Sequence, residues 1–176
     1  MALTKIKDYI VSPQECFFFD TNVWIFLYGQ IANYEKKKQQ SYSSLLSQII
    51  NRKSMIFISS LVLSEFINRN LQLEFKHWKN ITGNVNADFK RNFRQTVEYS
   101  NAKKTTIDTV KEIIEVTERR PDDFNAIDID ELLNYSNDCD FNDAYIALNC
   151  KRGKMILVTD DKDFSRSYPE LKILSA

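Results

Sequence analysis

Hydrophobic residues gather in short runs that alternate with longer amphipathic stretches along the chain. The run CFFF at residues 16–19 is apolar and aromatic, and MIFIS at 55–59 and MILVT at 155–159 have a similar character. Short apolar runs rich in aromatic and β-branched residues predict buried strands. Residues 171–174 predict a fourth, weaker strand. The pattern therefore predicts four short strands that are well separated in sequence.

Between these strands, apolar residues recur at the three- and four-residue spacing that is typical of one helix face. The predicted faces consist of Trp24, Leu27, Tyr28 and Ile31, then of Tyr42, Leu45, Leu46, Ile49 and Ile50, and then of Leu63, Phe66, Ile67 and Leu71. Ser59 or Ser60 is expected to cap the third of these helices. Strands that alternate with helices favour an α/β fold with a mainly parallel central sheet.

Two further helical regions follow. Residues 74–126 are polar and helical in composition, with breaks predicted at Gly83-Asn84 and at Pro121-Asp122. A later helix is expected from about Asp140 to Arg152, and Gly153 is expected to end it. Its predicted buried face consists of Phe141, Ala144, Tyr145 and Leu148.

Composition narrows the class of protein. The chain has 176 residues, 43% of them hydrophobic, with three Gly and three Pro. This length suits one domain with its own core, and so few Gly and Pro favour long helices over a barrel with many tight turns. No apolar run approaches the ~20 residues of a membrane-spanning helix, and no secretory signal is visible. The three cysteines form no C-x-x-C pair, so a reduced, cytoplasmic compartment is expected.

Charge is balanced overall but distributed unevenly. Lys plus Arg and Asp plus Glu number 24 each, so no global field attracts nucleic acid. Residues 74–104 carry seven Lys or Arg against three acids, whereas residues 105–143 carry twelve acids against three bases. The basic stretch contains several aromatic residues. It therefore predicts either a nucleic-acid track or a helical hairpin with an apolar inner face and a charged outer face.

Acidic residues follow three of the predicted strands. Asp20 comes directly after the first strand, Glu65 lies just past the second, and Asp160 and Asp161 follow the third. Sites in parallel sheets form beyond the carboxyl ends of the strands. These acids are therefore expected at one edge of the sheet.

Two more acids, Asp140 and Asp143, lie at the start of the predicted helix 140–152. Asp140 is expected to cap that helix, whereas Asp143 can point inward toward the same edge. Carboxylates brought together repel one another unless a cation joins them, and oxygen-only clusters select Mg²⁺ or Mn²⁺. The only histidine is His77, so Ser-His-Asp and Cys-His catalysis are disfavoured. A metal-activated water that attacks a phosphodiester suits such a cluster.

Four segments, in chain order, resemble the signature segments of PIN-domain ribonucleases, a family that includes the toxins of VapBC-type pairs. These segments are FFFDTNVWI, SSLVLSEFINR, DFNDAYIALNC and ILVTDDKDF. The resemblance implies a single PIN-like domain over residues 1–176, an α/β/α sandwich with a helical insertion at about 74–126. It also implies a ribonuclease that depends on Mg²⁺ or Mn²⁺ and acts on RNA. Its candidate partners are a small antitoxin and a second copy of the chain.

By position, the resemblance assigns the catalytic and metal-binding acids as Asp20, Glu65, Asp143 and Asp161. The last of these lies two residues after a threonine, as in the family, and its rivals are Asp160 and Asp163. The groups expected to orient the carboxylates are Thr21, Asn22, Thr159 and Asp163. In the basic stretch, the candidate substrate-binding residues are Lys76, Lys79, Lys90, Arg91 and Arg94.

Two alternative functions stay open at this point. Haloacid-dehalogenase-type phosphatases also place FFFD at a strand end, but they need an acid two residues later, where this chain has Asn22. A catalytically inactive PIN-like scaffold that binds RNA or protein would keep the fold without the chemistry. Four acids on one edge argue against such a scaffold, because neutral residues would relieve their repulsion.

Overall fold

The short apolar runs form one parallel sheet at the centre of the protein, in a computed structural model that describes residues 3–29, 35–121, 123–135 and 139–176. The described strands lie in the order β1-β6-β5-β2-β3-β4, and every neighbouring pair is parallel. Their bounds are β1 Thr4–Lys5, β2 Cys16–Phe19, β3 Met55–Ile58, β4 Glu118–Arg119, β5 Ile156–Val158 and β6 Ile173–Ser175.

Strand β2 occupies the middle of the sheet. Phe18 pairs with Phe57 of β3 on one side and with Leu157 of β5 on the other. Phe17, Phe18 and Phe19 are each at most 1% exposed, so successive side chains are buried on both faces of the sheet. A strand covered on both faces reads as a continuous apolar run, which is why CFFF shows no alternation.

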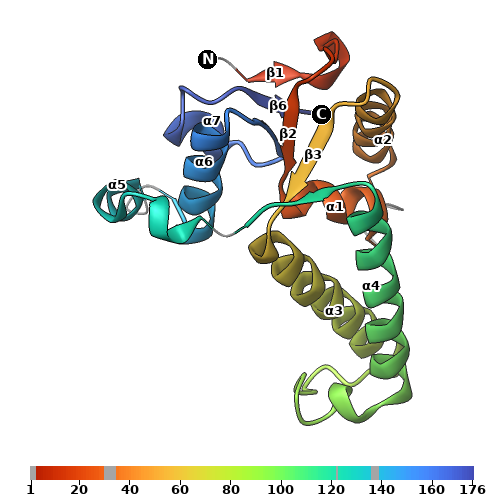
Figure 1. Cartoon of the computed structure of the whole chain (residues 1–176). Helices are drawn as coiled ribbons and strands as arrows, with labels where there is room; N and C mark the ends of the chain where they lie inside the picture. Colours follow the sequence, from red (N-terminus) through yellow and green to blue (C-terminus); the bar gives the residue numbers. More distant parts are fainter. Residues whose placement is uncertain (1–2, 30–34, 122, 136–138) are drawn as a thin grey trace.

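Helices cover both faces of this sheet. Figure 1 shows α1 and α2 on one side of the central strands and α5, α6 and α7 on the other, which makes three layers. The helices are α1 Thr21–Tyr28, α2 Lys36–Asn51, α3 Ser60–Thr82, α4 Val97–Glu115, α5 Ile129–Tyr135, α6 Phe141–Gly153 and α7 Asp163–Ser167. Single 3₁₀ turns are η1 Ile6–Asp8, η3 Phe93–Gln95 and η4 Phe124–Ala126. The predicted α/β sandwich with a parallel sheet is confirmed.

Helices α3 and α4 form a hairpin that projects from the body (Figure 1). Helix α3 has 23 residues, which corresponds to about 35 Å at 1.5 Å per residue. Near its middle, Asn70 Nδ2 donates a 2.8 Å hydrogen bond to Thr106 Oγ1 of α4. At the far end, aromatic rings pack around Phe93, which is 1% exposed. The rings in this cluster are Phe75, Trp78, Phe89, Phe93 and Tyr99.

The boundaries of this hairpin agree only in part with the sequence prediction. Gly83 ends α3 with φ +67°, a left-handed conformation that glycine adopts without steric cost. Helix α4 ends earlier than predicted, at Glu115, because strand β4 begins at Glu118 and pairs with β3. The predicted break at Pro121-Asp122 falls partly on a residue outside the described ones. Among the described residues, no helix is long and apolar enough to cross a membrane.

Several smaller predictions need correction. Strands β1 and β4 were not predicted, because each has only two residues and neither contains an apolar run. Strand β6 lies at Ile173–Ser175, slightly later than the predicted 171–174. Phe141 was placed on the buried face of α6, but it is 47% exposed. Ile31, assigned to the face of the first helix, lies outside the described residues.

Candidate active site

The carboxyl ends of β2, β3 and β5 meet at one edge of the sheet, and polar residues follow each strand there. Asp20 follows β2 and caps α1, Ser59 follows β3 and caps α3, and Thr159 follows β5. Asp20 and Thr159 are held side by side because β2 and β5 pair directly, with Phe19 opposite Val158. The sheet therefore delivers residues 139 positions apart to a single point.

Asp20 is buried, with 4% of its surface exposed, and both of its carboxylate oxygens accept hydrogen bonds. The backbone N–H of Thr21 donates to Oδ1 at 2.6 Å. The Asn22 amide donates to Oδ2 at 3.2 Å, and the Thr159 hydroxyl donates to the same oxygen at 2.9 Å. Three donors from two elements thus fix the orientation of this side chain.

Burial raises the pKa of Asp20 to about 6, from an ordinary value of 3.8. The hydrogen bonds from Thr159 and Thr21 oppose this rise, whereas the negative charges of Glu65 and Asp161 add to it. Loss of solvent disfavours the ionised form, and nearby like charges do the same. A bound cation would therefore stabilise the ionised carboxylate of Asp20.

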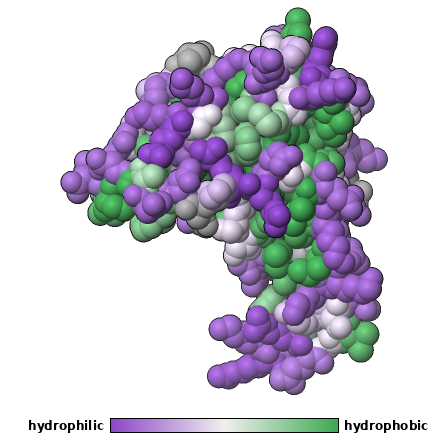
Figure 2. Space-filling view, viewed as in Figure 1, coloured by the Kyte–Doolittle hydropathy of each residue, from purple (hydrophilic) through white to green (hydrophobic). Residues whose placement is uncertain are grey.

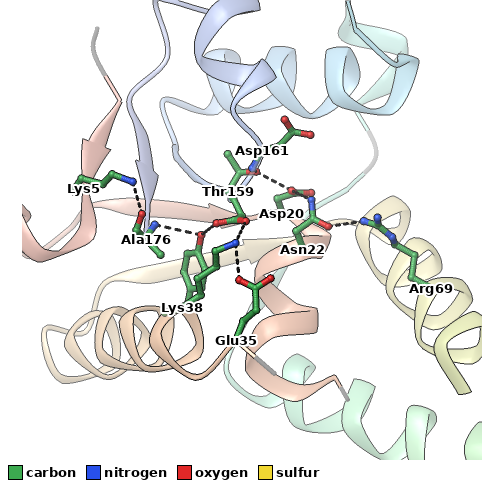
Figure 3. A network of polar contacts seen from close by, with 11 residues as sticks. Lys5, Asp20, Asn22, Glu35, Lys38, Arg69, Thr159, Asp161 and Ala176 are labelled. Carbon is green, nitrogen blue, oxygen red and sulfur yellow. Dashed lines mark hydrogen bonds and ion pairs between the residues drawn. The ribbon is translucent and has the colours of Figure 1, made fainter. Parts of the chain in front are cut away.

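Glu65 faces Asp20 from the second turn of α3. The Thr21 hydroxyl donates to Glu65 Oε2 at 3.0 Å, so Thr21 holds two carboxylates, Glu65 through its hydroxyl and Asp20 through its backbone N–H. On the other oxygen, Arg69 Nη1 lies 3.6 Å from Glu65 Oε1 and donates at 2.6 Å to Asn22 Oδ1. Figure 3 shows Asn22 between Asp20 and Arg69.

Arg69 was not among the predicted site residues. The available signal was its spacing, because an acid followed four residues later by Arg on a helix forms an ion pair. The structure adds what the spacing could not indicate, namely that the guanidinium also reaches Asn22 across the gap between α3 and α1.

Asp143 lies in the first turn of α6 and is half-buried. Burial raises its pKa to about 7, and the charges of Asp140, Asp20, Asp161 and Glu65 raise it further. Asp140 caps the same helix, as predicted, since its Oδ1 accepts a 2.7 Å hydrogen bond from the N–H of Asn142. The charges of the other three predicted acids therefore all act on Asp143.

The loop after β5 separates its three acids. The N–H of Asp161 donates to Thr159 Oγ1 at 3.0 Å, and Asp161 Oδ1 accepts from the N–H of Asp163 at 2.8 Å. Asp160 is held by α2 instead, because its carboxylate accepts hydrogen bonds from Lys38 Nζ at 2.9 Å and Tyr42 Oη at 3.2 Å.

Asp163 is exposed at the start of α7 and bonds Arg166 at 3.3 Å. Of the three rivals, Asp161 is the one whose charge raises the pKa values of both Asp20 and Asp143.

The four carboxylates suit a hard divalent cation, because such ions prefer oxygen ligands and because a bound cation would offset the repulsion between the negative charges. Within the described parts of the chain, no three His, Cys, Asp or Glu side chains are close enough to hold one metal ion as they stand. Binding would therefore require the carboxylates of Asp20, Asp143 and Asp161 to draw closer together. Rotation of surface-facing side chains can supply such a shift, since Asp143 and Asp161 are only half-buried.

The predicted substrate-binding residues do not form one group. Lys76 lines a groove between α1 and α3 that also contains Asn22, Arg69 and Gln72. The others lie toward the far end of the hairpin. Lys79 follows Glu65 by fourteen residues on α3, about 21 Å along the axis. Lys90, Arg91 and Arg94 lie beyond it, in the connection between α3 and α4.

A parallel sheet with helices on both faces, and carboxylates gathered beyond its central strands, defines an α/β protein with an acidic site at the carboxyl edge of the sheet. The sequence profile of the PIN domain matches residues 17–168, so the chain belongs to the PIN domain family. Members of this family are generally nucleases and typically use divalent metals. The match spans the four acids and the whole α3–α4 hairpin.

One solved structure supports the fold. The chain is 16% identical to a chain in the crystal structure of VapBC2 from Rickettsia felis bound to a DNA fragment from their promoter, with a TM-score of 0.51. That alignment covers 92% of this chain and 99% of the other. A second similar structure is PAE2754 from Pyrobaculum aerophilum, at 14% identity and a TM-score of 0.49, with coverage of 93% and 92%. A search of curated proteins finds no significant match.

Proposed function

We propose that the protein is an endoribonuclease that depends on Mg²⁺ or Mn²⁺ and hydrolyses phosphodiester bonds of RNA. The observation that carries the proposal is the convergence of Asp20, Asp143, Asp161 and Glu65 at the carboxyl edge of the sheet. Burial and mutual charge raise the pKa of Asp20 to about 6 and that of Asp143 to about 7. Perturbed carboxylates of this kind are concentrated at functional sites.

In this proposal, Asp20, Asp143 and Asp161 hold the principal metal ion, and Glu65 orients or deprotonates water or recruits a second ion. A bound divalent ion would lower the pKa of a water molecule and neutralise charge on the phosphate oxygens. The remaining residues prepare the site. Thr21, Asn22 and Thr159 orient Asp20, and the N–H of Asp163 fixes Asp161.

The groove between α1 and α3 is the proposed path for the RNA backbone next to the acids. Arg69 and Lys76 supply its positive charge, and Asn22 and Gln72 supply polar groups. Lys79, Lys90, Arg91 and Arg94 extend this path along the hairpin for a longer RNA. Their aromatic neighbours pack against one another around Phe93, so these rings contribute to the hairpin core and the cations alone would face phosphates.

We further propose that the protein is the toxin of a type II toxin–antitoxin pair that acts in the cytoplasm. The support is family membership together with the fold shared with a chain of VapBC2, a protein pair crystallised on promoter DNA. A small antitoxin protein and a second copy of the chain are the partners that this role implies.

The test is cleavage of single-stranded RNA by the purified protein with Mg²⁺, with Mn²⁺ and with EDTA. We expect metal-dependent cleavage that Asp20→Asn abolishes, because the central buried carboxylate is lost. Asp130→Asn is the matched control, since Asp130 is an exposed acid on α5. Normal cleavage by Asp20→Asn would show that the site assignment is wrong.

A catalytically inactive PIN-like scaffold is the second candidate. The observation that favours it is the spacing of the acids. Within the described residues, no three of them lie close enough together to hold one metal ion. Absence of metal-dependent cleavage, combined with measurable RNA binding, would favour this candidate over the nuclease.

A further inference from the structure

A second pocket lies between α3 and α6, whereas the basic groove lies between α1 and α3. Its walls come from the start of α3, from η4 and from the start of α6. Three aromatic residues, Phe124, Phe141 and Tyr145, line it together with the polar side chains of Ser60, Ser64 and Asn142. No charged residue contributes to this lining.

The helix starts that line this pocket also carry two of the four acids. Ser64 directly precedes Glu65 on α3, and Asn142 directly precedes Asp143 on α6. Glu65 and Asp143 therefore lie within one residue of the pocket lining along the chain. Helix α3 contributes residues both to this pocket and to the groove of Arg69 and Lys76.

Two of the three aromatic side chains in the pocket are unusually accessible. Phe124 is 51% exposed and Phe141 is 47% exposed, although each belongs to a helical segment that contacts the body. The rings of Phe124 and Tyr145 lie 6.2 Å apart and are tilted by 43°. Exposed rings beside polar groups suit a flat ligand that stacks on one face and forms hydrogen bonds along its edge.

We propose that this pocket binds one unstacked nucleobase of the RNA substrate, from a nucleotide next to the bond that is cut. The proposal rests on the nuclease function above. A phosphate would find no cation in this lining and would lie next to Glu65 and Asp143, so it would be repelled. A base is neutral, stacks on Phe124 or Phe141, and can form hydrogen bonds with Ser60, Ser64 and Asn142. Only a single-stranded nucleotide can present a base in this way.

The groove and the pocket thus recognise different parts of one RNA strand. The groove of Arg69 and Lys76 binds the backbone on one side of the acids, and the aromatic pocket binds a base on the other. This arrangement makes cleavage dependent on an unpaired nucleotide, since a base inside a duplex cannot enter the pocket. The pocket is also the part of the site at which base preference would arise, through the edges that Ser60, Ser64 and Asn142 can reach.

The first test combines Phe141→Ala with a short RNA in which single abasic sites are scanned along the strand. For the wild type, we expect kcat/KM to fall about tenfold when the abasic site occupies one particular position, as expected for loss of one stacked base. Phe141→Ala should lower kcat/KM on the intact strand to a similar extent and should be insensitive to the abasic site. Phe141→Trp should restore activity, because it keeps a stacking surface.

The matched control is Ile129→Ala, which removes another accessible apolar side chain, 44% exposed, from α5. It should cleave RNA at the wild-type rate. If the wild type cleaves RNA but the abasic scan is flat and Phe141→Ala has normal activity, the base pocket is wrong and the nuclease function stands.

A second measurement does not depend on cleavage. In an Asp20→Asn background, a short RNA that contains 2-aminopurine should lose fluorescence on binding, because the probe stacks on a ring. Introducing Phe141→Ala should abolish this quenching, whereas Ile129→Ala should preserve it. If the wild type cleaves no RNA, the proposed function fails, and quenching that depends on Phe141 would still support a base-binding pocket. Quenching that is absent or unaffected by Phe141→Ala would overturn the pocket.

Discussion

The hydroxyl of Thr159 donates a 2.9 Å hydrogen bond to Asp20 Oδ2, and it also accepts a 3.0 Å hydrogen bond from the N–H of Asp161. One buried hydroxyl thus connects two of the proposed metal ligands, one after β2 and one after β5. Thr159 is fully buried, so water cannot replace it. This relationship makes Thr159 the residue through which the two loops are aligned.

Replacing Thr159 with Val should weaken metal binding without unfolding the protein. Val has nearly the same shape but has no hydroxyl, so Asp20 loses a donor that lowers its pKa, and the backbone N–H of Asp161 loses its acceptor. We expect the affinity for Mn²⁺, measured by isothermal titration calorimetry at pH 7, to fall roughly 10- to 100-fold. Thr109→Val on α4 is the control and should bind Mn²⁺ normally. Unchanged affinity in Thr159→Val would remove Thr159 from the site.

The stability of the metal-free protein should decrease as the pH rises from 4 to 7. The folded-state pKa of Asp20 is about 6, above its ordinary value of 3.8. Between these values the folded protein binds a proton that the unfolded chain has lost, so the free energy of unfolding falls with pH. The full loss from Asp20 is on the order of 3 kcal/mol, for a shift of about two pKa units. Asp143, with a pKa of about 7, extends the decrease toward neutral pH.

Urea unfolding at a series of pH values in EDTA measures this dependence. Asp20→Asn should flatten the decrease and stabilise the metal-free protein at pH 7.5, because it removes a buried charge. Saturating Mn²⁺ should stabilise the wild type most at the higher pH, since the ligands must lose protons before they bind metal. A free energy of unfolding that rises between pH 4 and 7 in EDTA would contradict the assigned environment of Asp20.

Arg69→Gln should weaken the binding of a short RNA. Arg69 is about half exposed at the groove between α1 and α3, so its guanidinium is available to a phosphate while it contacts Asn22 and Glu65. Loss of one phosphate contact should reduce the slope of log affinity against log salt concentration by about one unit. Binding measured by fluorescence anisotropy at several salt concentrations checks this.

The control for this experiment is Arg91→Gln, at the far end of the hairpin. A short RNA bound at the acids should not reach Arg91, so its affinity and salt dependence should match those of the wild type. A longer RNA should distinguish the variant from the wild type if the basic residues of the hairpin extend the binding path. Equal effects of both variants on the short RNA would contradict the separation of groove and hairpin end.

Phe93→Ala should unfold the end of the hairpin and leave the sheet intact. Phe93 is 1% exposed and packs against Phe75, Trp78, Phe89 and Tyr99. Truncating such a ring costs about 3–5 kcal/mol where the surroundings cannot collapse. Hydrogen exchange should speed up in residues 75–105, whereas amides of β2 and β5 should remain protected. Loss of protection throughout the sheet would mean that the hairpin and the body unfold together.

Much of the site could be predicted because it depends on strand ends. The first charged residue after an apolar run marks the end of a buried parallel strand. Asp20 follows CFFF, and Asp160 and Asp161 follow MILVT, so these acids mark one edge of the sheet. Ser59 was recognisable as a cap for the same local reason, and Val62 N–H does bond its hydroxyl. These features are encoded within a few residues.

Other features depend on contacts between distant segments, which the sequence does not display. Asp160 forms hydrogen bonds with Lys38 and Tyr42 of α2, which lie more than 110 residues earlier, and this pairing, which favours Asp161 as the proposed ligand, has no signal in the sequence around Asp160. Strands β1 and β4 exist only because they pair with β6 and β3, and their own residues are polar. Phe141 has helical spacing consistent with burial, yet the surface it faces is the pocket described above.

The two outermost strands have a consequence for how the protein meets other chains. Figure 2 shows a surface that is largely hydrophilic, with apolar side chains in patches where the hairpin leaves the body. β1 and β4 each offer only two residues, and Glu118 and Arg119 of β4 are both charged and exposed. Edge strands this short, with charged residues, offer another polypeptide few backbone groups with which to extend the sheet. Extension of the sheet by a second polypeptide, including fibril-like edge-to-edge growth, is therefore disfavoured at both of these strands.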